Sequence, residues 1–302
     1  MYFLILGPIL SISSSNWILC WSGMELGFFS LMPLLLMGNF SMSKGVVMKY
    51  FSIQAFSSVL LFFSGMMIFS FFYKDTIILL MFLFSVSLKL GFFPGHFWVP
   101  SVVSGLDWFS CCLILGPLKI APLALLVIFL QLYSNLQVTV MFLGVLSAFY
   151  GAILGNNQTN IRAMIGASSI SHTGWMINAT IFGQMWMYFS VYMVTLFMFL
   201  FMMMKLDYLN AMMNLISMSG LPPFFMFIMK VNILYNLITM NVWPFMALLI
   251  LSSVISLVFY LKFSYSLILN TNVFKSMYLY IFMILNLFGV FFIFFGGRKI
   301  SQ

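Results

Sequence analysis

The sequence has 302 residues, of which 64% are hydrophobic and only 5% are charged, and its mean hydropathy is +1.16. An ordinary globular chain carries about 25% charged residues, so this chain cannot cover a water-facing surface, and it has too few charges for intrinsic disorder. We therefore expect a polytopic membrane protein. The formal net charge of +8 comes from 12 lysines and arginines scattered singly between apolar runs, which excludes the clustered basic face that nucleic-acid binding requires.

Apolar runs separated by short polar stretches follow one another along the chain. A membrane-spanning helix needs about 20 apolar residues, whereas the strands of a membrane barrel alternate apolar and polar positions, and these runs do not alternate. We count about eleven segments and expect a single all-α membrane domain over residues 1–302, with no soluble domain. The segments are Tyr2–Ser13, Trp17–Met37, Val46–Phe72, Thr76–Val99, Leu106–Leu132, Leu136–Leu154, Ile161–Phe182, Trp186–Met204, Ala211–Met240, Val242–Leu269 and Tyr278–Phe295.

The positive charges between the segments predict the orientation of the chain, because short loops rich in Lys and Arg stay on the inner side of a membrane. With eleven segments, one side holds twice as many cations as the other, which predicts an inner N-terminus and an outer C-terminus. The inner cations are Lys44, Lys49, Arg162, Lys205, Lys262 and Lys275, and the outer ones are Lys74, Arg298 and Lys299.

The beginning of the chain, Met1–Leu10, has neither the basic start nor the small-residue cleavage site of a signal peptide. It also lacks an arginine-rich amphipathic presequence. We therefore expect the chain to be made beside its own membrane. Its 28 Met and 38 Phe are typical of an AT-rich organellar genome.

Four charged residues lie deep inside the apolar segments: Glu25, Lys89, Lys119 and Lys230. Each is roughly 13–20 Å from the ends of its segment at the rise of an α-helix. A charge near the middle of a bilayer costs about 2.5–3.5 kcal/mol on insertion scales, so we expect these residues to have a function. Apolar surroundings favour the neutral form of lysine, which allows a lysine that water reaches to take up and release protons.

A structural explanation for these charges is a buried ion pair that fixes helix register. Such a pair accounts for Glu25 and one lysine, but it leaves two lysines without an intramembrane acid, because Asp75, Asp107 and Asp207 all lie at segment ends. We therefore favour a proton or cation relay over structural pairing.

Helix-breaking residues stand close to each of the three lysines. Interrupted helices expose backbone carbonyls and dipole ends beside ion sites in transporters, so we expect breaks at these places. The residues are Gly91, Pro94 and Gly95 after Lys89, Gly116 and Pro117 before Lys119, and Gly220, Pro222 and Pro223 before Lys230.

The two histidines of the sequence are His96 and His172, which is too few for a membrane cytochrome with two bis-histidine haems. His172 lies in a polar patch with Ser168 and Ser169, where structural hydrogen bonding and support of a water chain are equally open. For His96, beside Trp98, we favour a structural role.

The sequence contains no motif for a cofactor. Cys20, Cys111 and Cys112 lie in apolar stretches without the spacing of a metal or iron–sulfur site, so we expect buried thiols. No Walker motif, GxGxxG turn or paired catalytic carboxylates occur. We expect the chain itself to bind no cofactor or metal.

Several short motifs between residues 15 and 265 occur in an order that resembles one family. In this order they are similar to the NADH dehydrogenase subunit 2 family, whose members are membrane subunits of the proton-pumping mitochondrial NADH:ubiquinone oxidoreductase, respiratory complex I. The motifs are Ser15–Leu26, Lys49–Ala55, Lys89–Pro100, Leu118–Pro122, Asn157–Arg162, Ser168–Met176 and Ser219–Pro223 ahead of Lys230.

The resemblance implies an antiporter-like bundle of two inverted repeats, each with a broken helix, in a form shortened relative to bacterial members. It implies that Glu25 and Lys89 are a coupled acid–lysine pair, that Lys119 is the central lysine and that Lys230 is the distal lysine. The implied activity belongs to the whole complex in the mitochondrial inner membrane. NADH, FMN, iron–sulfur clusters and ubiquinone would be held by partner subunits, and the neighbours would be lipid and other membrane-arm and accessory subunits.

The sequence departs from the family pattern at four positions that concern loop contacts and packing rather than the central charges. They are Gly95, Ser101, Ala163 and Ala167. Two other functions stay open. One is a stand-alone cation/proton antiporter of the same fold, and the other is a structural subunit of the membrane arm that does not pump.

Overall fold

The computed structural model describes residues 2–36, 43–73, 75–222 and 224–269, and the regular structure of these residues is entirely helical. A π-helical turn, Met66–Ser70, extends α3, and a 3-10 turn, Ser134–Leu136, precedes α8. The α-helices are α1 (Tyr2–Ser13), α2 (Trp17–Leu36), α3 (Ser43–Gly65), α4 (Thr76–Leu90), α5 (Trp98–Val103), α6 (Trp108–Leu115), α7 (Pro117–Leu132), α8 (Gln137–Asn156), α9 (Ile161–Ile181), α10 (Met185–Met204), α11 (Tyr208–Ser219), α12 (Phe225–Thr239) and α13 (Trp243–Leu269).

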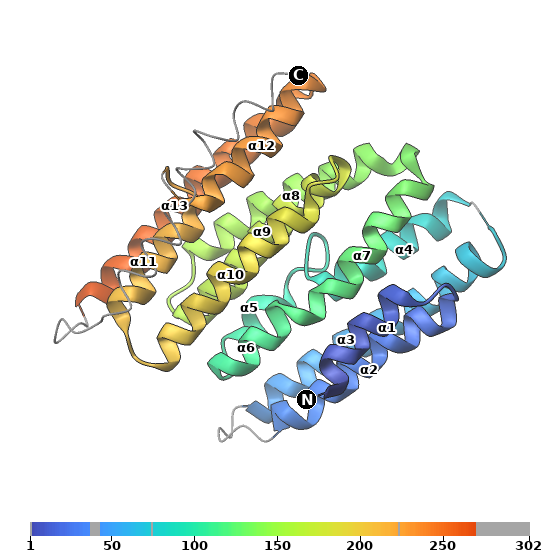
Figure 1. Ribbon diagram of the computed structural model, residues 1–302, viewed down its shortest axis with the longest axis horizontal. Helices are drawn as coiled ribbons and strands as arrows, with labels where there is room; N and C mark the ends of the chain where they lie inside the picture. The colour runs from blue at the N-terminus through green and yellow to red at the C-terminus, as the bar shows by residue number, and fades with distance from the viewer. Residues whose placement is uncertain (1, 37–42, 74, 223, 270–302) are drawn as a thin grey trace.

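The helices lie side by side along a common direction, and the chain crosses the bundle from one edge to the other (Figure 1). Helices α1–α3 form one edge and α11–α13 form the opposite edge. Helix α9 lies between them and contacts α5, α7, α8, α10, α12 and α13. Its residues from Ala163 to Thr180 are all buried, which is why a helix rich in Ser, Thr and His can lie inside a membrane protein.

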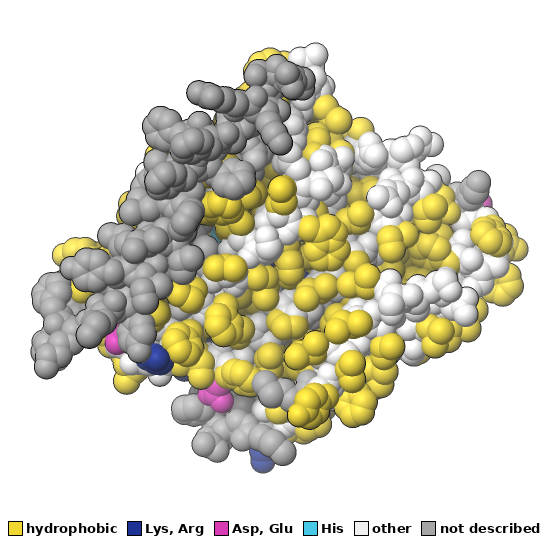
Figure 2. All heavy atoms as spheres, viewed as in Figure 1, with side chains coloured by type: hydrophobic (Ala, Val, Ile, Leu, Met, Phe, Trp, Pro, Cys, Tyr) yellow, Lys and Arg dark blue, Asp and Glu magenta, His cyan; other side chains and the backbone are white. Residues whose placement is uncertain are grey.

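The outer faces of the bundle are apolar, as contact with lipid requires. In the part of the chain that the structure describes, six helical stretches are long and apolar enough to cross a membrane, and α1, α4 and α12 are shorter apolar helices. Large side chains such as Phe63, Val138 and Val194 are more than half exposed on these faces. Figure 2 shows hydrophobic side chains across the visible face, with charged ones near its margins. The chain is a membrane-embedded, multi-pass protein, as the composition predicts.

Three predicted segments are interrupted instead of continuous. The stretch Thr76–Val99 divides into α4 and α5, Leu106–Leu132 into α6 and α7, and Ala211–Met240 into α11 and α12. The expected helix breaks are thus confirmed, because each of these three apolar segments consists of two helices.

Two of these breaks begin at a glycine in the left-handed backbone region, which other residues adopt only at a cost. Gly91 follows α4 with φ +74°, and Gly220 follows α11 with φ +78°. Lys89 consequently lies in the last turn of α4 and not in the middle of a continuous helix. With 15 residues, α4 spans only about 22 Å. Its C-terminal end, which carries Lys89, therefore still lies inside a hydrocarbon core of about 30 Å.

The predicted last segment, Tyr278–Phe295, lies outside the described residues, as do Lys74, Lys275, Arg298, Lys299 and Pro223. Eleven membrane crossings therefore stay a prediction.

The described cations outside the interior gather at one end of the bundle. Helix direction places them at the end that carries the α8–α9 and α10–α11 turns, at the lower left of Figure 1. We refer to it as the α10–α11 end. The cations are Lys44, Lys49, Arg162, Lys205 and Lys262.

Candidate functional site

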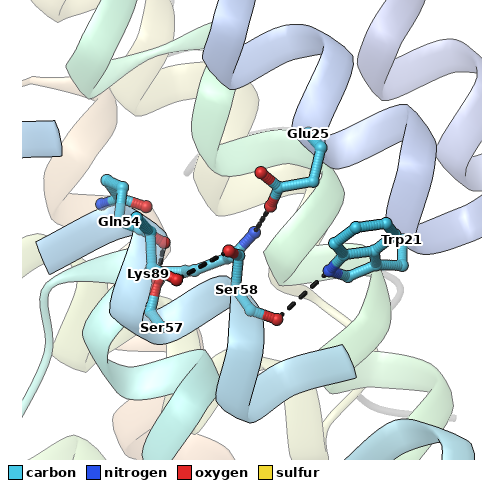
Figure 3. Close-up of polar contacts among 7 residues, drawn as sticks. Trp21, Glu25, Gln54, Ser57, Ser58 and Lys89 are labelled. Carbon is cyan, nitrogen blue, oxygen red and sulfur yellow. Dashed lines mark hydrogen bonds and ion pairs between the residues drawn. The ribbon is translucent and has the colours of Figure 1, made fainter. Parts of the chain in front are cut away.

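An ion pair within the bundle joins two of the four deep charges. Lys89 on α4 donates a hydrogen bond from Nζ to Oε1 of Glu25 on α2 over 2.9 Å, and both side chains are less than 10% exposed. Figure 3 shows Gln54, Ser57 and Ser58 of α3 beside this pair. Trp21, one turn before Glu25, donates from Nε1 to the carbonyl oxygen of Ser58 over 3.2 Å, and this bond fixes α2 against α3.

A cavity of about 40 Å³ is lined by both Lys89 and Lys119. Tyr50 and Gln54 of α3 are also among its lining residues, together with Trp98. A cavity needs about 10–15 Å³ to hold a water molecule, which also needs polar partners. Both conditions are met here, so the space between the two lysines can hold water.

Lys119 lies in the first turn of α7, directly after the break at Gly116 and Pro117. Its side chain is 4% exposed, and its Nζ has no hydrogen-bond acceptor among the described residues. An isolated buried ammonium is costly, and a lysine without a fixed partner can change its protonation without breaking an ion pair.

His172 on α9 is held by two tyrosines. Its Nδ1 lies 3.0 Å from the hydroxyl of Tyr188 and its Nε2 lies 3.0 Å from the hydroxyl of Tyr260. Helix α9 contacts both α7, which carries Lys119, and α12, which carries Lys230. The histidine is therefore on a helix that packs against both lysine-bearing helices, and its ring nitrogens have hydroxyl partners that can donate or accept a hydrogen bond.

Ser168 and Ser169, the other two residues of the expected water-chain support, are fully buried on α9. Their hydroxyls donate to the backbone carbonyls of Ile165 and Gly166 over 2.8 and 2.7 Å. Such bonds satisfy a serine inside a helix without any water. Their support of a water chain stays a prediction.

Lys230 on α12 reaches across the second break. Its Nζ donates to the carbonyl oxygen of Ser219, the last residue of α11, over 2.8 Å, and it lies 5.7 Å from the ring centroid of Trp175. The C-terminal end of a helix carries partial negative charge. The break thus supplies to Lys230 a dipolar partner in place of an acid.

The second histidine and the three cysteines were also singled out in the sequence. His96 is buried between α4 and α5 against Phe93, Phe97 and Tyr150, a position in keeping with the favoured structural role. Cys20 and Cys111 are buried and Cys112 is partly buried, all as free thiols. Among the described residues, no group of three or more His, Cys, Asp or Glu side chains is arranged to hold a metal.

Sequence reasoning missed several neutral polar residues. Tyr50 and Gln54 line the cavity, the tyrosines bind His172, and two asparagines, Asn210 and Asn214, are fully buried on α11. A search for Asn and Gln inside apolar segments would have found Gln54 and Asn214, because intramembrane polar residues are rare enough to mark functional sites.

Comparison with known proteins shows which family of membrane proteins this chain belongs to. Residues 14–206 match the family described as "NADH:quinone oxidoreductase/Mrp antiporter, TM", and the chain belongs to this family. A solved chain of respiratory complex I from Thermus thermophilus has a TM-score of 0.75 over 88% of this chain and 69% of that one, at 19% identity. A chain of an archaeal membrane-bound sulfane sulfur reductase has a TM-score of 0.80 over 98% of this chain and 72% of that one, at 16% identity. These two show a shared fold.

Curated relatives point to a narrower group of proteins within this family. NADH-ubiquinone oxidoreductase chain 2 of Albinaria caerulea is 37% identical over 287 residues, which cover 94% of this chain and 93% of that relative. The protein of the same name from Anopheles gambiae is 33% identical over 88% of this chain and 84% of its own length. These matches confirm the resemblance that the motifs indicated.

Proposed function

We propose that this chain is a proton-translocating subunit in the membrane arm of the mitochondrial NADH:ubiquinone oxidoreductase. The observation that carries the proposal is the buried line formed by the Glu25–Lys89 pair, the cavity, Lys119, His172 and Lys230. The names of the curated relatives support membership of that complex. NADH oxidation and quinone reduction take place in partner subunits, which hold NADH, FMN, iron–sulfur clusters and ubiquinone.

The first step in the proposed mechanism is a change in the ion pair. Charge movement in neighbouring subunits separates Lys89 from Glu25, and the free ammonium then lies next to the cavity that Lys119 also lines. A positive charge there disfavours a proton on Lys119, so Lys119 releases its proton. When the pair forms again, Lys119 takes up the next one.

The second step transfers a proton between Lys119 and Lys230 past His172. Moving one charge against the membrane potential costs about 2.3 kcal/mol per 100 mV, so the proton affinities of the lysines have to change by a comparable free energy. Opening and closing of the Glu25–Lys89 pair supplies this change, because a buried ion pair in a medium of low dielectric interacts strongly with a nearby charge.

The proposed orientation places the α10–α11 end on the matrix side of the inner membrane. All the described cations outside the interior lie at this end, as the retention of positive loops predicts. The N-terminus then lies in the matrix and the C-terminus in the intermembrane space. The neighbours are other membrane-arm and accessory subunits and the lipid bilayer.

Replacement of Lys119 tests the proposal. Lys119→Met keeps most of the length and the apolar character of the side-chain stem but removes the titrating amine. In complex that contains this variant, purified and reconstituted into vesicles, we expect fewer protons translocated per NADH oxidised. An unchanged ratio would take Lys119 out of the proton path and favour a purely structural subunit.

A further inference from the structure

Helix α11 carries a stripe of buried polar residues that the proposed path does not use. Asn210, Asn214 and Ser217 all have 0% exposure. Their spacing of four and three residues places them on one face of the helix, and that face is turned into the protein. The next polar residue, Ser219, ends the helix and accepts the hydrogen bond from Lys230.

Most polar atoms of the two amides in this stripe lack partners among the described residues. Both polar side-chain atoms of Asn210 and the Oδ1 atom of Asn214 have no hydrogen bond to any described residue. The Nδ2 atom of Asn214 donates to the backbone oxygen of Asn210 over 3.0 Å. An unpaired buried polar group costs about 1–3 kcal/mol and is uncommon in native proteins. Three such atoms within one helical turn call for a role other than packing.

The stripe connects Lys230 with one end of the bundle. Helix α11 begins beside the α10–α11 turn, where Asp207 occupies the N-cap position, and it ends at the break that Lys230 contacts. Asn210 is two residues from the beginning of the helix, and Asn214 lies one turn further in. The polar face therefore runs from the α10–α11 end to the carbonyl oxygen that binds Lys230.

Along α12 itself, the opposite direction from Lys230 is apolar. On its own face of α12, the residues three and seven positions further along are Ile233 and Leu237, which are 1% and 0% exposed. Buried polar side chains on α11 therefore offer a proton a route to and from Lys230. This face of α12 offers no hydrogen-bonding side chain.

We infer that Asn210 and Asn214 are positioning residues that hold a water chain between Lys230 and the α10–α11 end. The inference rests on the proposed function and names the route by which Lys230 exchanges protons with that side of the membrane. An asparagine amide does not titrate, but it donates and accepts hydrogen bonds and so orients water molecules. A proton passes from bulk water near Asp207 along these waters to the neutral amine of Lys230, which becomes an ammonium, and it returns by the same steps in reverse.

Two substitutions at one position separate this role from packing. Asn214→Leu keeps the branched shape and removes the hydrogen bonds, whereas Asn214→Ser keeps a polar group but leaves a smaller side chain. A water chain needs polarity, so the serine variant should retain more proton translocation per NADH oxidised than the leucine variant. A packing role gives the reverse order, because the smaller side chain leaves a cavity.

The matched control is Asn178→Leu on α9. Asn178 is also fully buried, its Oδ1 is also unpaired, and its Nδ2 also donates to the carbonyl four residues earlier. It lies near the C-terminal end of α9, away from the α10–α11 end, and its replacement should leave the ratio of protons to NADH unchanged. If Asn214→Leu does not assemble into the complex, Asn210→Leu replaces it in the same comparison.

The experiment also includes Lys230→Met, so that the inference and the proposed function can fail separately. A loss in Asn214→Leu as large as that in Lys230→Met, with Asn178→Leu unaffected, supports the inference. A loss in Lys230→Met with none in Asn214→Leu overturns the inference alone. If Lys230→Met translocates protons normally, Lys230 is not on the path and the proposed function itself fails at that residue.

Discussion

At the scale of single residues, the Glu25–Lys89 pair has two roles that mutation can separate. Removing one partner leaves a buried charge unpaired, which costs about 3–5 kcal/mol. Replacing both partners by neutral residues of similar size removes that penalty. Stability and proton transfer should therefore respond differently to single and double substitutions.

The first prediction compares Lys89→Met with the double variant Glu25→Gln plus Lys89→Met. We expect the single variant to lower the amount and thermal stability of assembled complex, because Glu25 is left buried without its lysine. We expect the double variant to recover assembly without recovering the proton-to-NADH ratio. Full recovery of the ratio in the double variant would assign the pair a structural role only.

The second prediction concerns the two buried histidines, both 2% exposed. His172→Phe removes the hydrogen bonds to Tyr188 and Tyr260, and each buried group left unpaired costs about 1–3 kcal/mol. His96→Phe is the control, because its Nδ1 has no partner among the described residues. We expect a clear fall in the melting temperature of the complex for His172→Phe and a small change for His96→Phe. Equal changes would contradict a special role for the tyrosine contacts.

Sequence reasoning at this scale found the charged residues but missed their neutral partners. Four charges inside apolar runs are conspicuous because each is costly there. Tyr188 and Tyr260 are ordinary in a helix that meets lipid, and nothing in their local sequence shows that they meet His172 across 16 and 88 residues.

At the scale of helices, the breaks position the lysines. The left-handed glycines end α4 and α11, so Lys89 and the carbonyl oxygen of Ser219 come to lie inside the bundle. Sequence reasoning expected breaks from glycine and proline near the lysines. It could not place the ends of the half-helices, because the same residues also occur within continuous membrane helices.

The third prediction is a series of glycine-to-alanine substitutions. Alanine in the left-handed region costs about 1–2 kcal/mol. At Gly91 a Cβ would also clash with Val99 Cγ2, and at Gly220 it would lie 3.1 Å from Lys230 Nζ, whereas Gly183, with φ +69°, has open space around it. We expect Gly91→Ala to destabilise the assembled complex most, as measured by thermal melting. We expect Gly220→Ala, but not Gly183→Ala, to lower the proton-to-NADH ratio.

The control for this series is Gly45→Ala, which has neither left-handed backbone nor a neighbour within 4 Å. Because alanine favours the helix by about 0.5–1 kcal/mol over glycine, this variant should be neutral or slightly stabilising. A ratio lowered equally by Gly220→Ala and Gly183→Ala would show that backbone strain, and not displacement of Lys230, is responsible.

At the scale of the whole molecule, the exposed apolar faces need lipid or other membrane subunits around them. The fold does not choose between a subunit of a large complex and a stand-alone antiporter, because the family includes both kinds of protein in its description. The fourth prediction addresses this choice. On a native gel of gently solubilised membranes stained for NADH dehydrogenase activity, peptides of this chain should occur in a very large active band.

The opposite outcome of that experiment is also informative. If the chain occurs solely in a small inactive band, it works without the oxidoreductase, and the buried charges should then be tested for cation exchange. The matching control is a protein already known to belong to the oxidoreductase, detected in the same membranes and on the same gel.

The sequence by itself determined the membrane class, the helical architecture, the places of the breaks and the four buried charges. Each of these follows from local properties: apolar length, the backbone preferences of glycine and proline, and the cost of charge in hydrocarbon. The pairing of Glu25 with Lys89 was implied by the family resemblance and not by any local property. Only the tertiary structure decided that Lys89 and Lys119 line one cavity and that the asparagines of α11 face inward. These features depend on contacts between helices far apart in the chain, and such contacts have no local signature.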